Sequence, residues 1–323
     1  MRRMPALVVI VFLAALVTGC GSSSDRAQRL TLAALNTPAA KPAPSTPSGP
    51  EPRGCGDVTA SLRPPSVMPA PGTVPAVSFM AKIERRGYLI AGVDQNTKLF
   101  AYFNPLDGQL EGLEIDMLRD LAKAIFGNPN AIVFKAITTA ERISSVQDGS
   151  VDVVADAMTI TCARRRQVDF STVYYNAGQK LLVPTNSPVR SVKDLAAKRV
   201  CATIGSTSLT TLESKAPRAI PYRVQQRTDC LVALEQGLVD AITSDDSILL
   251  GFKAQDPDTK IVGSRFADEP YGMAINKTHP DFVRFVNGVL AQMRADGAWR
   301  AIYSRWLGKF ARTPAPPAAH YDG

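Results

Sequence analysis

The sequence predicts an α/β protein made of two similar lobes. Short apolar, β-branched stretches alternate with segments whose apolar residues recur at helical spacing, which is typical of a parallel sheet covered by helices. This alternation runs through residues 88–155 and starts again at residue 199. Two segments, 149–152 and 237–240, share a Gly-x-Val-Asp core after a short predicted helix. A chain of 323 residues has room for two such lobes.

Three strands and two helices are predicted for the first lobe. Apolar residues at helical spacing from Met117 to Ile125 indicate the longer helix, which ends at Gly127. The shorter helix is expected at residues 141–147, just before a glycine. The strands are predicted at residues 88–93, 131–136 and 151–155.

The second lobe repeats this order, and the chain then returns to the first. A strand at residues 199–203 leads into a turn, residues 205–208, that opens a helix. Residues 271–275 are predicted to form the strand that crosses back. The remaining elements are strands at 220–224 and 239–243 and helices at 230–236, 282–293 and 298–307.

The N-terminus has the features of an export signal. Arg2 and Arg3 precede a twelve-residue apolar run, residues 6–17, and small residues lead up to Cys20. A membrane-spanning helix, the alternative, needs about 20 apolar residues. The position of the cysteine resembles the lipobox of bacterial lipoproteins. This resemblance implies cleavage before Cys20, a lipid on its sulfur, and anchoring on the outer face of the cytoplasmic membrane, in the periplasm or cell envelope.

The composition changes toward both ends of the chain. Residues 20–76 are rich in Pro, Ala, Ser and Thr and are predicted to be an extended, mostly disordered tether. Residues 311–323 are expected to be a flexible tail. The other predicted parts are a signal peptide at 1–19, a first lobe at 77–182 and 270–310, and a second lobe at 183–269.

Composition also excludes several classes of function. The net charge is +8, but the basic run at residues 164–166 has no aromatic residues between its arginines, so we expect no nucleic-acid partner. The chain has two histidines, and its cysteines lack C-x-x-C spacing, so zinc sites and Ser-His or Cys-His catalysis are not expected. We therefore expect a protein that is not an enzyme and has no metal or cofactor.

Four cysteines remain beyond Cys20. In an exported protein an even set usually forms disulfides. Three pairings are possible, and we favour Cys201 with Cys230, because both lie on adjacent elements of one lobe; this leaves Cys55 with Cys162. Free buried thiols are the alternative.

Polar residues gather where the predicted strands end, the edge at which open α/β sheets bind ligands. The first lobe supplies Thr159 and Arg164, a pair that suits a carboxylate. The second lobe supplies the turn at Ser206 and Thr207, whose free N–H groups favour an anion, and Asp245, which suits an ammonium group. A ligand that carries both groups is an α-amino acid.

Longer stretches resemble a known family. Residues 159–171, with Thr-Ile-Thr followed by Arg-Arg-Arg-Gln-Val-Asp-Phe-Ser, resemble the signature of family 3 extracellular solute-binding proteins, as do residues 108–116, 205–208 and 239–246. The resemblance covers about residues 83–307. It implies a two-lobe, periplasmic-binding-protein-like fold of type II, with a hinge and an interlobe ligand cleft. It also implies delivery of glutamate, glutamine, aspartate or asparagine to an ABC permease.

The resemblance assigns roles to the polar residues. Arg164 would hold the α-carboxylate of the ligand, helped by Thr159 and the backbone at Thr207. Asp245 and the carbonyl group of Ala157 would hold the α-ammonium group. A solvated basic patch and a helix N-cap are the alternatives for Arg164 and Asp245.

The same resemblance gives the aromatic residues a role. Phe100 would stack over the ligand with Tyr102 beside it, and simple core packing is the alternative. Asp156 stands where the family has a small residue and could orient the arginine. A glutamate or aspartate ligand needs a second cation, for which Lys98 and Lys180 are candidates.

Two rival functions stay open at this point. The ligand-bound form could engage a membrane receptor, which would make the protein a sensor. Cyclohexadienyl dehydratases resemble these binding proteins, so an enzyme on the same fold is the other alternative. That chemistry needs a general acid beside a bound carboxylate, and Asp156 is the one unusual carboxylate in the expected place.

Overall fold

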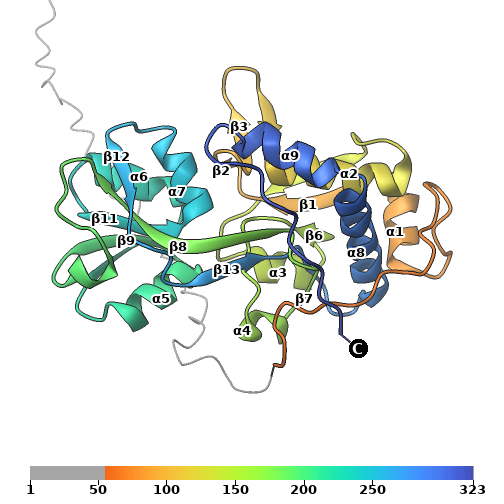
Figure 1. Ribbon diagram of the computed structural model, residues 1–323. Coiled ribbons are helices and arrows are strands. Elements are labelled where there is room, and N and C mark those ends of the chain that lie inside the picture. Colours follow the sequence, from red (N-terminus) through yellow and green to blue (C-terminus); the bar gives the residue numbers. More distant parts are fainter. Residues whose placement is uncertain (1–54, 323) are drawn as a thin grey trace, which may run out of the picture. The chain divides into compact units, whose positions relative to one another are not determined.

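The computed structural model describes residues 55–322. The predicted signal peptide, Cys20 and the start of the predicted tether lie outside these residues. Two large β-sheets form the two lobes, and helices cover each of them (Figure 1). A third, small sheet consists of β2 (Asn96–Thr97), β3 (Ala101–Asn104) and β4 (Gln109–Glu111).

The first lobe is built on a five-stranded sheet. The strand order is β5 (Ile132–Ala136), β1 (Leu89–Val93), β6 (Val153–Val154), β14 (Ala274–Ile275) and β7 (Asp169–Phe170). Strand β1 is parallel to β5 and β6, whereas the returning strand β14 is antiparallel to β6 and β7. Its helices are α1 (Phe79–Arg86), α2 (Leu113–Phe126), α3 (Arg142–Gln147), α4 (Cys162–Arg165), α8 (Pro280–Ala295) and α9 (Ala298–Leu307).

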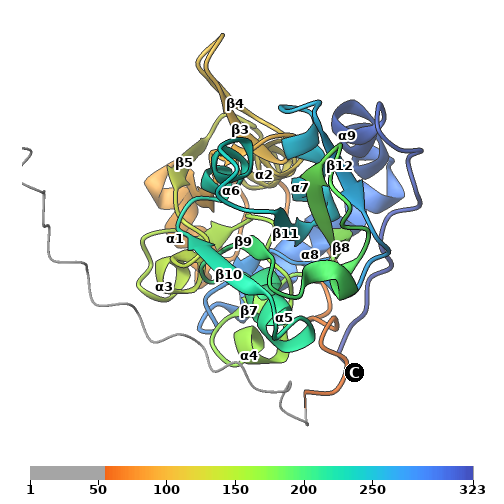
Figure 2. The ribbon, with the colours of Figure 1, turned by 90° about the vertical axis from the view of Figure 1, so that its left-hand side faces the viewer.

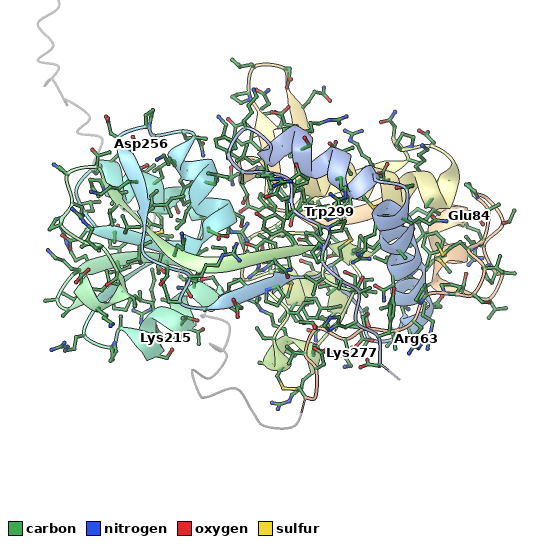
Figure 3. The ribbon with its side chains drawn as sticks, in the orientation of Figure 1. Arg63, Glu84, Lys215, Asp256, Lys277 and Trp299 are labelled. Carbon is green, nitrogen blue, oxygen red and sulfur yellow. A yellow bond between two sulfur atoms is a disulfide. The ribbon has the colours of Figure 1, made fainter. Side chains whose placement is uncertain are left out.

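Helix α2 shows how this lobe is held together. Its apolar face shares one buried core with Leu89 and Ala91 of β1. It begins after Gly112, where a Cβ atom would lie 2.1 Å from the carbonyl oxygen of Phe100, so only glycine fits this close approach. Trp299 of α9, labelled in Figure 3, donates its indole N–H to the carbonyl oxygen of Tyr174 at 2.8 Å.

The second lobe is built on a six-stranded sheet. The strand order is β10 (Ile220–Val224), β9 (Arg199–Thr203), β11 (Ala241–Asp245), β8 (Tyr175–Pro184) and β12 (Thr259–Val262), with β13 (Asp268–Tyr271) also paired to β8. Figure 2 shows β9 and β10 side by side, as their parallel pairing requires. Its helices are the 3-10 turn η1 (Val192–Leu195), α5 (Thr207–Lys215), α6 (Arg227–Glu235) and α7 (Asp246–Lys253).

Two strands join the lobes. The ten-residue strand β8 pairs with β11 and β12 at one end and, through β13, reaches Tyr271 at the other. The predicted lobe boundaries at residues 182 and 270 fall within β8 and β13. The predicted crossing strand at 271–275 is divided into β13 and β14; between them, the N–H of Gly272 donates to the carbonyl oxygen of Met158 at 3.1 Å.

The ends of the described chain differ from the predicted tether and tail. Both pack on the first lobe: Asn287 of α8 donates to the carbonyl oxygen of Leu62 at 2.7 Å, and Arg294 of α8 donates to the carbonyl oxygen of Pro317 at 3.0 Å. The Pro/Ala-rich composition predicted an extended, mostly disordered tether and gave no sign of this docking. We call residues 55–62 the strap.

The structure contains the two disulfides that the sequence favoured. Cys201 of β9 is bonded to Cys230 of α6, with 5.5 Å between their Cα atoms. Cys55 of the strap is bonded to Cys162 of α4, with 5.8 Å between Cα atoms. Within residues 55–322, no helix is long and apolar enough to cross a membrane.

Candidate functional site

Arg164 lies where the two lobes meet. It belongs to the short helix α4, whose first turn is capped by the side-chain oxygen of Thr161, which accepts from the N–H of Arg164. Arg164 is 8% exposed, and its guanidinium donates to the carbonyl oxygens of Thr159, at 2.7 Å, and Gly205 of the second lobe, at 3.1 Å. Burial and the nearby Arg142 lower the pKa of Arg164 to about 9. Arg164 is therefore a buried cation between the lobes, and not part of a solvated basic patch.

Two hydroxyl groups, one from each lobe, meet beside this arginine. The hydroxyl oxygens of Thr159 and Thr207 lie 3.3 Å apart. Both hydroxyls donate to the same carboxylate oxygen of Glu269, and the bond from Thr207 is 2.7 Å long. Glu269 belongs to β13 and is 2% exposed; burial raises its pKa. The predicted carboxylate site thus holds an internal carboxylate. The rule that ligands bind at strand ends does not lead to Glu269, because Glu269 lies on a crossing strand.

Asp245 ends β11 and lies in the same buried region. It accepts hydrogen bonds from the hydroxyl of Tyr271, at 2.6 Å, and from Ser208, at 3.2 Å. Although Asp245 is at the N-cap position of α7, its side chain makes no capping bond. Burial, followed by the charge of Glu269, raises its pKa from 3.8 to about 7.

Ala157 has an unusual backbone conformation. Its φ is +42°, a strained value for alanine, and its N–H donates to Glu114 at 2.7 Å. The carbonyl group assigned to the ligand's ammonium accepts from Arg142 at 3.3 Å. Glu114 is buried, which together with the charge of Asp156 raises its pKa to about 7.

The turn at Ser206 differs from the expectation of free N–H groups. The N–H of Ser206 donates to the carbonyl oxygen of Thr203 at 3.2 Å, and its hydroxyl accepts from the N–H of Leu209 at 3.1 Å. Ser206 therefore caps helix α5 and shapes the turn. The neighbouring Gly205 comes so close to the first lobe that a Cβ atom would lie 2.9 Å from the Cα of Ala140.

A cross-lobe ion-pair cluster was not predicted. Arg227, the first residue of α6, donates to Asp94 at 2.7 Å, to Asp156 at 2.5 Å and to Thr97 at 2.9 Å. Arg227 is 4% exposed, and Asp156 is fully buried. Asp156 thus pairs with Arg227 rather than orienting Arg164. The strand-end rule could have found this cluster, since Asp94 follows β1 and Arg227 follows β10.

The two predicted aromatic residues have different surroundings. Phe100 is fully buried and packs edge-to-face on Tyr175 and Tyr271, with ring centres 5.1 and 6.2 Å away. Tyr102 lies on β3 of the small sheet, whose β3–β4 hairpin extends away from the lobes (Figure 2). The ammonium of Lys98 lies 5.6 Å from its ring centre. The structure therefore places Phe100, but not Tyr102, with the strands that carry Glu269 and Tyr271.

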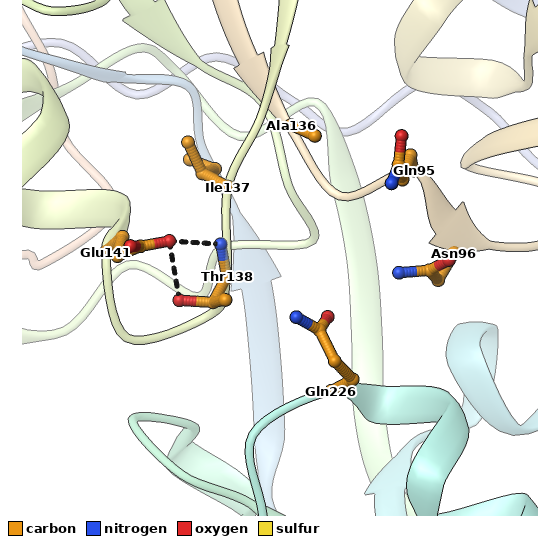
Figure 4. A pocket seen from close by; sticks show the side chains of 7 residues that line it. All are labelled: Gln95, Asn96, Ala136, Ile137, Thr138, Glu141 and Gln226. Carbon is orange, nitrogen blue, oxygen red and sulfur yellow. Dashed lines mark hydrogen bonds between the residues drawn. The ribbon is translucent and has the colours of Figure 1, made fainter. Parts of the chain in front are cut away.

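An open pocket of about 100 Å³ adjoins the ion-pair cluster. Figure 4 shows side chains from both lobes around it, with Gln226 of the second lobe facing Asn96 and Gln95. Thr138 donates its N–H and its hydroxyl to Glu141, each at 2.8 Å. The other lining residues are Ala136 and Ile137.

Comparison with protein families identifies the chain. Residues 89–309 match the model of the bacterial extracellular solute-binding proteins, family 3. The chain belongs to this family. The expected family and two-lobe fold are thereby confirmed.

Curated members of the family have related sequences. The chain is 37% identical over 229 residues to the ABC transporter glutamine-binding protein GlnH of Bacillus subtilis, covering 71% of this chain and 84% of that protein. It is 37% identical over 213 residues to a glutamine-binding protein of Geobacillus stearothermophilus, covering 66% and 81%. It is 28% identical over 243 residues to the glutamate-binding protein GluB of Corynebacterium glutamicum, covering 72% and 82%.

Solved structures of the family share the fold. An ancestral arginine-binding protein bound to glutamine has a TM-score of 0.65 and 33% identity, with 69% of this chain and 99% of that chain covered. The solute receptor for L-cysteine of Neisseria gonorrhoeae has a TM-score of 0.70 and 25% identity, covering 74% and 99%.

Buried charged groups gather where the lobes of this solute-binding protein meet. Three guanidinium groups, those of Arg142, Arg164 and Arg227, lie among five buried carboxyl groups. The carboxyl groups belong to Asp94, Glu114, Asp156, Asp245 and Glu269. Among the described residues Arg142 and Arg227 are already paired with carboxyl groups, so a second negative charge on a ligand would have to share a cation.

Proposed function

We propose that this protein is an exported binding protein that captures a polar amino acid and delivers it to an ABC permease. One observation carries the proposal: Thr159 and Arg164 of the first lobe contact Thr207 and Gly205 of the second, and the charge of Asp245 acts on the nearby Arg164. This is the set of groups that a zwitterion needs, and it comes from both lobes, so a ligand there would draw the lobes together by a hinge motion. The glutamine-binding and glutamate-binding relatives support the same conclusion.

In this proposal, the ligand's α-carboxylate replaces the carboxylate of Glu269. Thr159 and Thr207 already donate to a carboxylate in the structure, which supports their role as carboxylate ligands. Arg164 supplies the opposite charge, and Asp245 receives the ammonium group. Phe100 packs behind the site rather than beside solvent.

The charge balance favours a neutral side chain on the ligand. Arg227, a cation near the far end of the site, is already paired with Asp94 and Asp156. A glutamate ligand would add a buried carboxylate without a partner, whereas a side-chain amide can be satisfied by hydrogen bonds. Glutamine is therefore the proposed first-choice ligand, followed by asparagine.

We further propose that Cys20 carries the lipid anchor. The small residues before it and the short apolar run support this assignment. Mass spectrometry of the N-terminal peptide from the native membrane fraction tests it: a diacylglycerol-modified Cys20 is expected. An unmodified N-terminus that begins at another residue contradicts it.

A ligand screen by thermal unfolding tests the binding proposal. The chain from residue 21 onward is heated with each common amino acid in turn. A ligand at 100 times its Kd adds about 2.7 kcal/mol of stability, which raises Tm by several degrees. A shift with glutamine or asparagine that exceeds the shift with glutamate supports the proposal. No shift with any amino acid contradicts it.

A further inference from the structure

The strap is joined to helix α4 at both ends of that helix. Cys55 is disulfide-bonded to Cys162, its first residue. Arg165, its last residue, donates to the carbonyl oxygens of Asp57, at 3.0 Å, and Val58, at 3.1 Å. The strap therefore spans the outer side of α4.

Helix α4 depends on such external contacts. It has four residues, whereas an isolated helix needs about 12 residues to be even marginally stable in water. Other contacts that hold it include the cap by Thr161, the hydrogen bonds of the Arg164 guanidinium, and a hydrogen bond from Lys277, labelled in Figure 3, to the carbonyl oxygen of Arg165 at 2.8 Å. Loss of the strap contacts would remove support from both ends at once.

Arg164 and Arg165 are adjacent, but their side chains have different partners. The guanidinium of Arg164 donates to Thr159 and Gly205 where the lobes meet, whereas that of Arg165 donates to the strap. Both side chains start from the same turn of backbone. A shift of α4 away from the strap therefore shifts Arg164 relative to the candidate ligand site.

The strap is itself firmly attached to the first lobe. The hydroxyl of Ser61, 2% exposed, donates to the carbonyl oxygen of Phe170 at 2.6 Å and accepts from Asn287 at 2.8 Å. A carboxylate oxygen of Asp57 lies 2.8 Å from Nδ1 of His320 in the C-terminal tail. Since Asn287 is fully buried in α8, the strap connects α4 to the rigid body of the lobe.

We propose that the strap is a positioning element for the ligand site: its disulfide to Cys162 and its contacts with Arg165 fix α4 and, through α4, the guanidinium of Arg164. This inference rests on the proposed role of Arg164 as the ligand's carboxylate anchor. It gives the Cys55–Cys162 disulfide a role in affinity in addition to stability.

The first test needs no ligand. Hydrogen–deuterium exchange is measured by mass spectrometry on peptides that cover residues 159–168, in the wild type and in the double variant Cys55→Ala/Cys162→Ala. Exchange at α4 is expected to be at least about tenfold faster in the variant, because local opening becomes easier. The matched control is Cys201→Ala/Cys230→Ala, which removes a disulfide from the other lobe and should leave α4 unchanged. Equal exchange at α4 in the strap variant and the wild type overturns the proposal.

The second test links the strap to the ligand, with glutamine as the probe in calorimetry. The strap variant should bind glutamine about tenfold more weakly, which corresponds to about 1.4 kcal/mol. In an Arg164→Ala background, removal of the strap disulfide should weaken binding no further, because the group it positions is gone. An equal loss in both backgrounds, or no loss in the wild-type background, refutes the positioning role.

A milder variant covers the case in which the disulfide variant does not fold. Arg165→Ala keeps the disulfide and removes the two hydrogen bonds to the strap; it should raise α4 exchange and lower glutamine affinity in the same direction, by smaller factors. No change in α4 exchange refutes the role of Arg165. If the wild type binds no amino acid, the proposed function fails, and the exchange experiment still decides whether the strap holds α4.

Discussion

Replacement of Arg164 by alanine is the most direct test of the candidate site. The residue is 8% exposed, and its guanidinium makes charged hydrogen bonds of 2.7 and 3.1 Å. Without it, a ligand carboxylate would be enclosed between the lobes with hydroxyl donors alone. A buried charge that loses its partner weakens binding by about 2–5 kcal/mol, so the affinity for glutamine should fall by about 30-fold to 5,000-fold.

The assay is isothermal titration calorimetry with glutamine, with urea unfolding of the same samples. Arg85→Ala is the matched control, because it removes an equal charge from an exposed position of the same lobe. The control should keep its affinity within about twofold, since surface substitutions usually change free energies by about 0.5 kcal/mol or less. Unchanged affinity in Arg164→Ala would refute the reasoning and remove Arg164 from the site.

Three further predictions concern stability. Arg227→Ala should lower the free energy of unfolding by about 3–5 kcal/mol in urea titrations, because two buried carboxylates lose their partner. The control Arg223→Ala, at an exposed position, should leave this free energy unchanged. Equal losses in the two variants would contradict the prediction. Cys201→Ala/Cys230→Ala opens a loop with a sequence separation of 29 residues and should lower stability by about 3–4 kcal/mol; an unchanged urea midpoint would contradict it. Asp245 has a folded pKa of about 7 against 3.8 unfolded, so its folded form binds the proton more tightly. The contribution of Asp245 to the free energy of unfolding is therefore lost as pH rises from about 4 to about 7. Wild-type stability should fall relative to that of Asp245→Asn over this range, and parallel pH profiles would refute the assignment.

The strand ends of each lobe could be predicted from sequence. The strands at residues 199–203 and 220–224 coincide with β9 and β10, because each is a short apolar or β-branched run bounded by turns. The rule that ligands bind beyond the carboxyl ends of strands then singled out Arg164, Thr207 and Asp245. Arg164 and Thr207 contact residues of the opposite lobe, and Asp245 bonds to Tyr271 of the crossing strand.

Residues whose partners come from another part of the fold could not be predicted in this way. Glu269 looks like any acidic residue in the sequence, and only the pairing of β13 with β8 brings it to Thr159 and Thr207. The strap is another case, since its composition is that of a linker. Its docking depends on Asn287, which is more than 220 residues away in the sequence.

The position of Gly205 has a consequence for how closely the two lobes can approach each other. Its carbonyl oxygen accepts from Arg142 and Arg164 of the opposite lobe, and Arg227 adds further bonds across the same boundary. Residue 205 therefore limits how closely the lobes can approach each other. A side chain at this position would hold them apart, because even a Cβ atom would lie 2.9 Å from the Cα of Ala140. If delivery proceeds as proposed, a permease would recognise such a variant less well, whichever amino acid it carries.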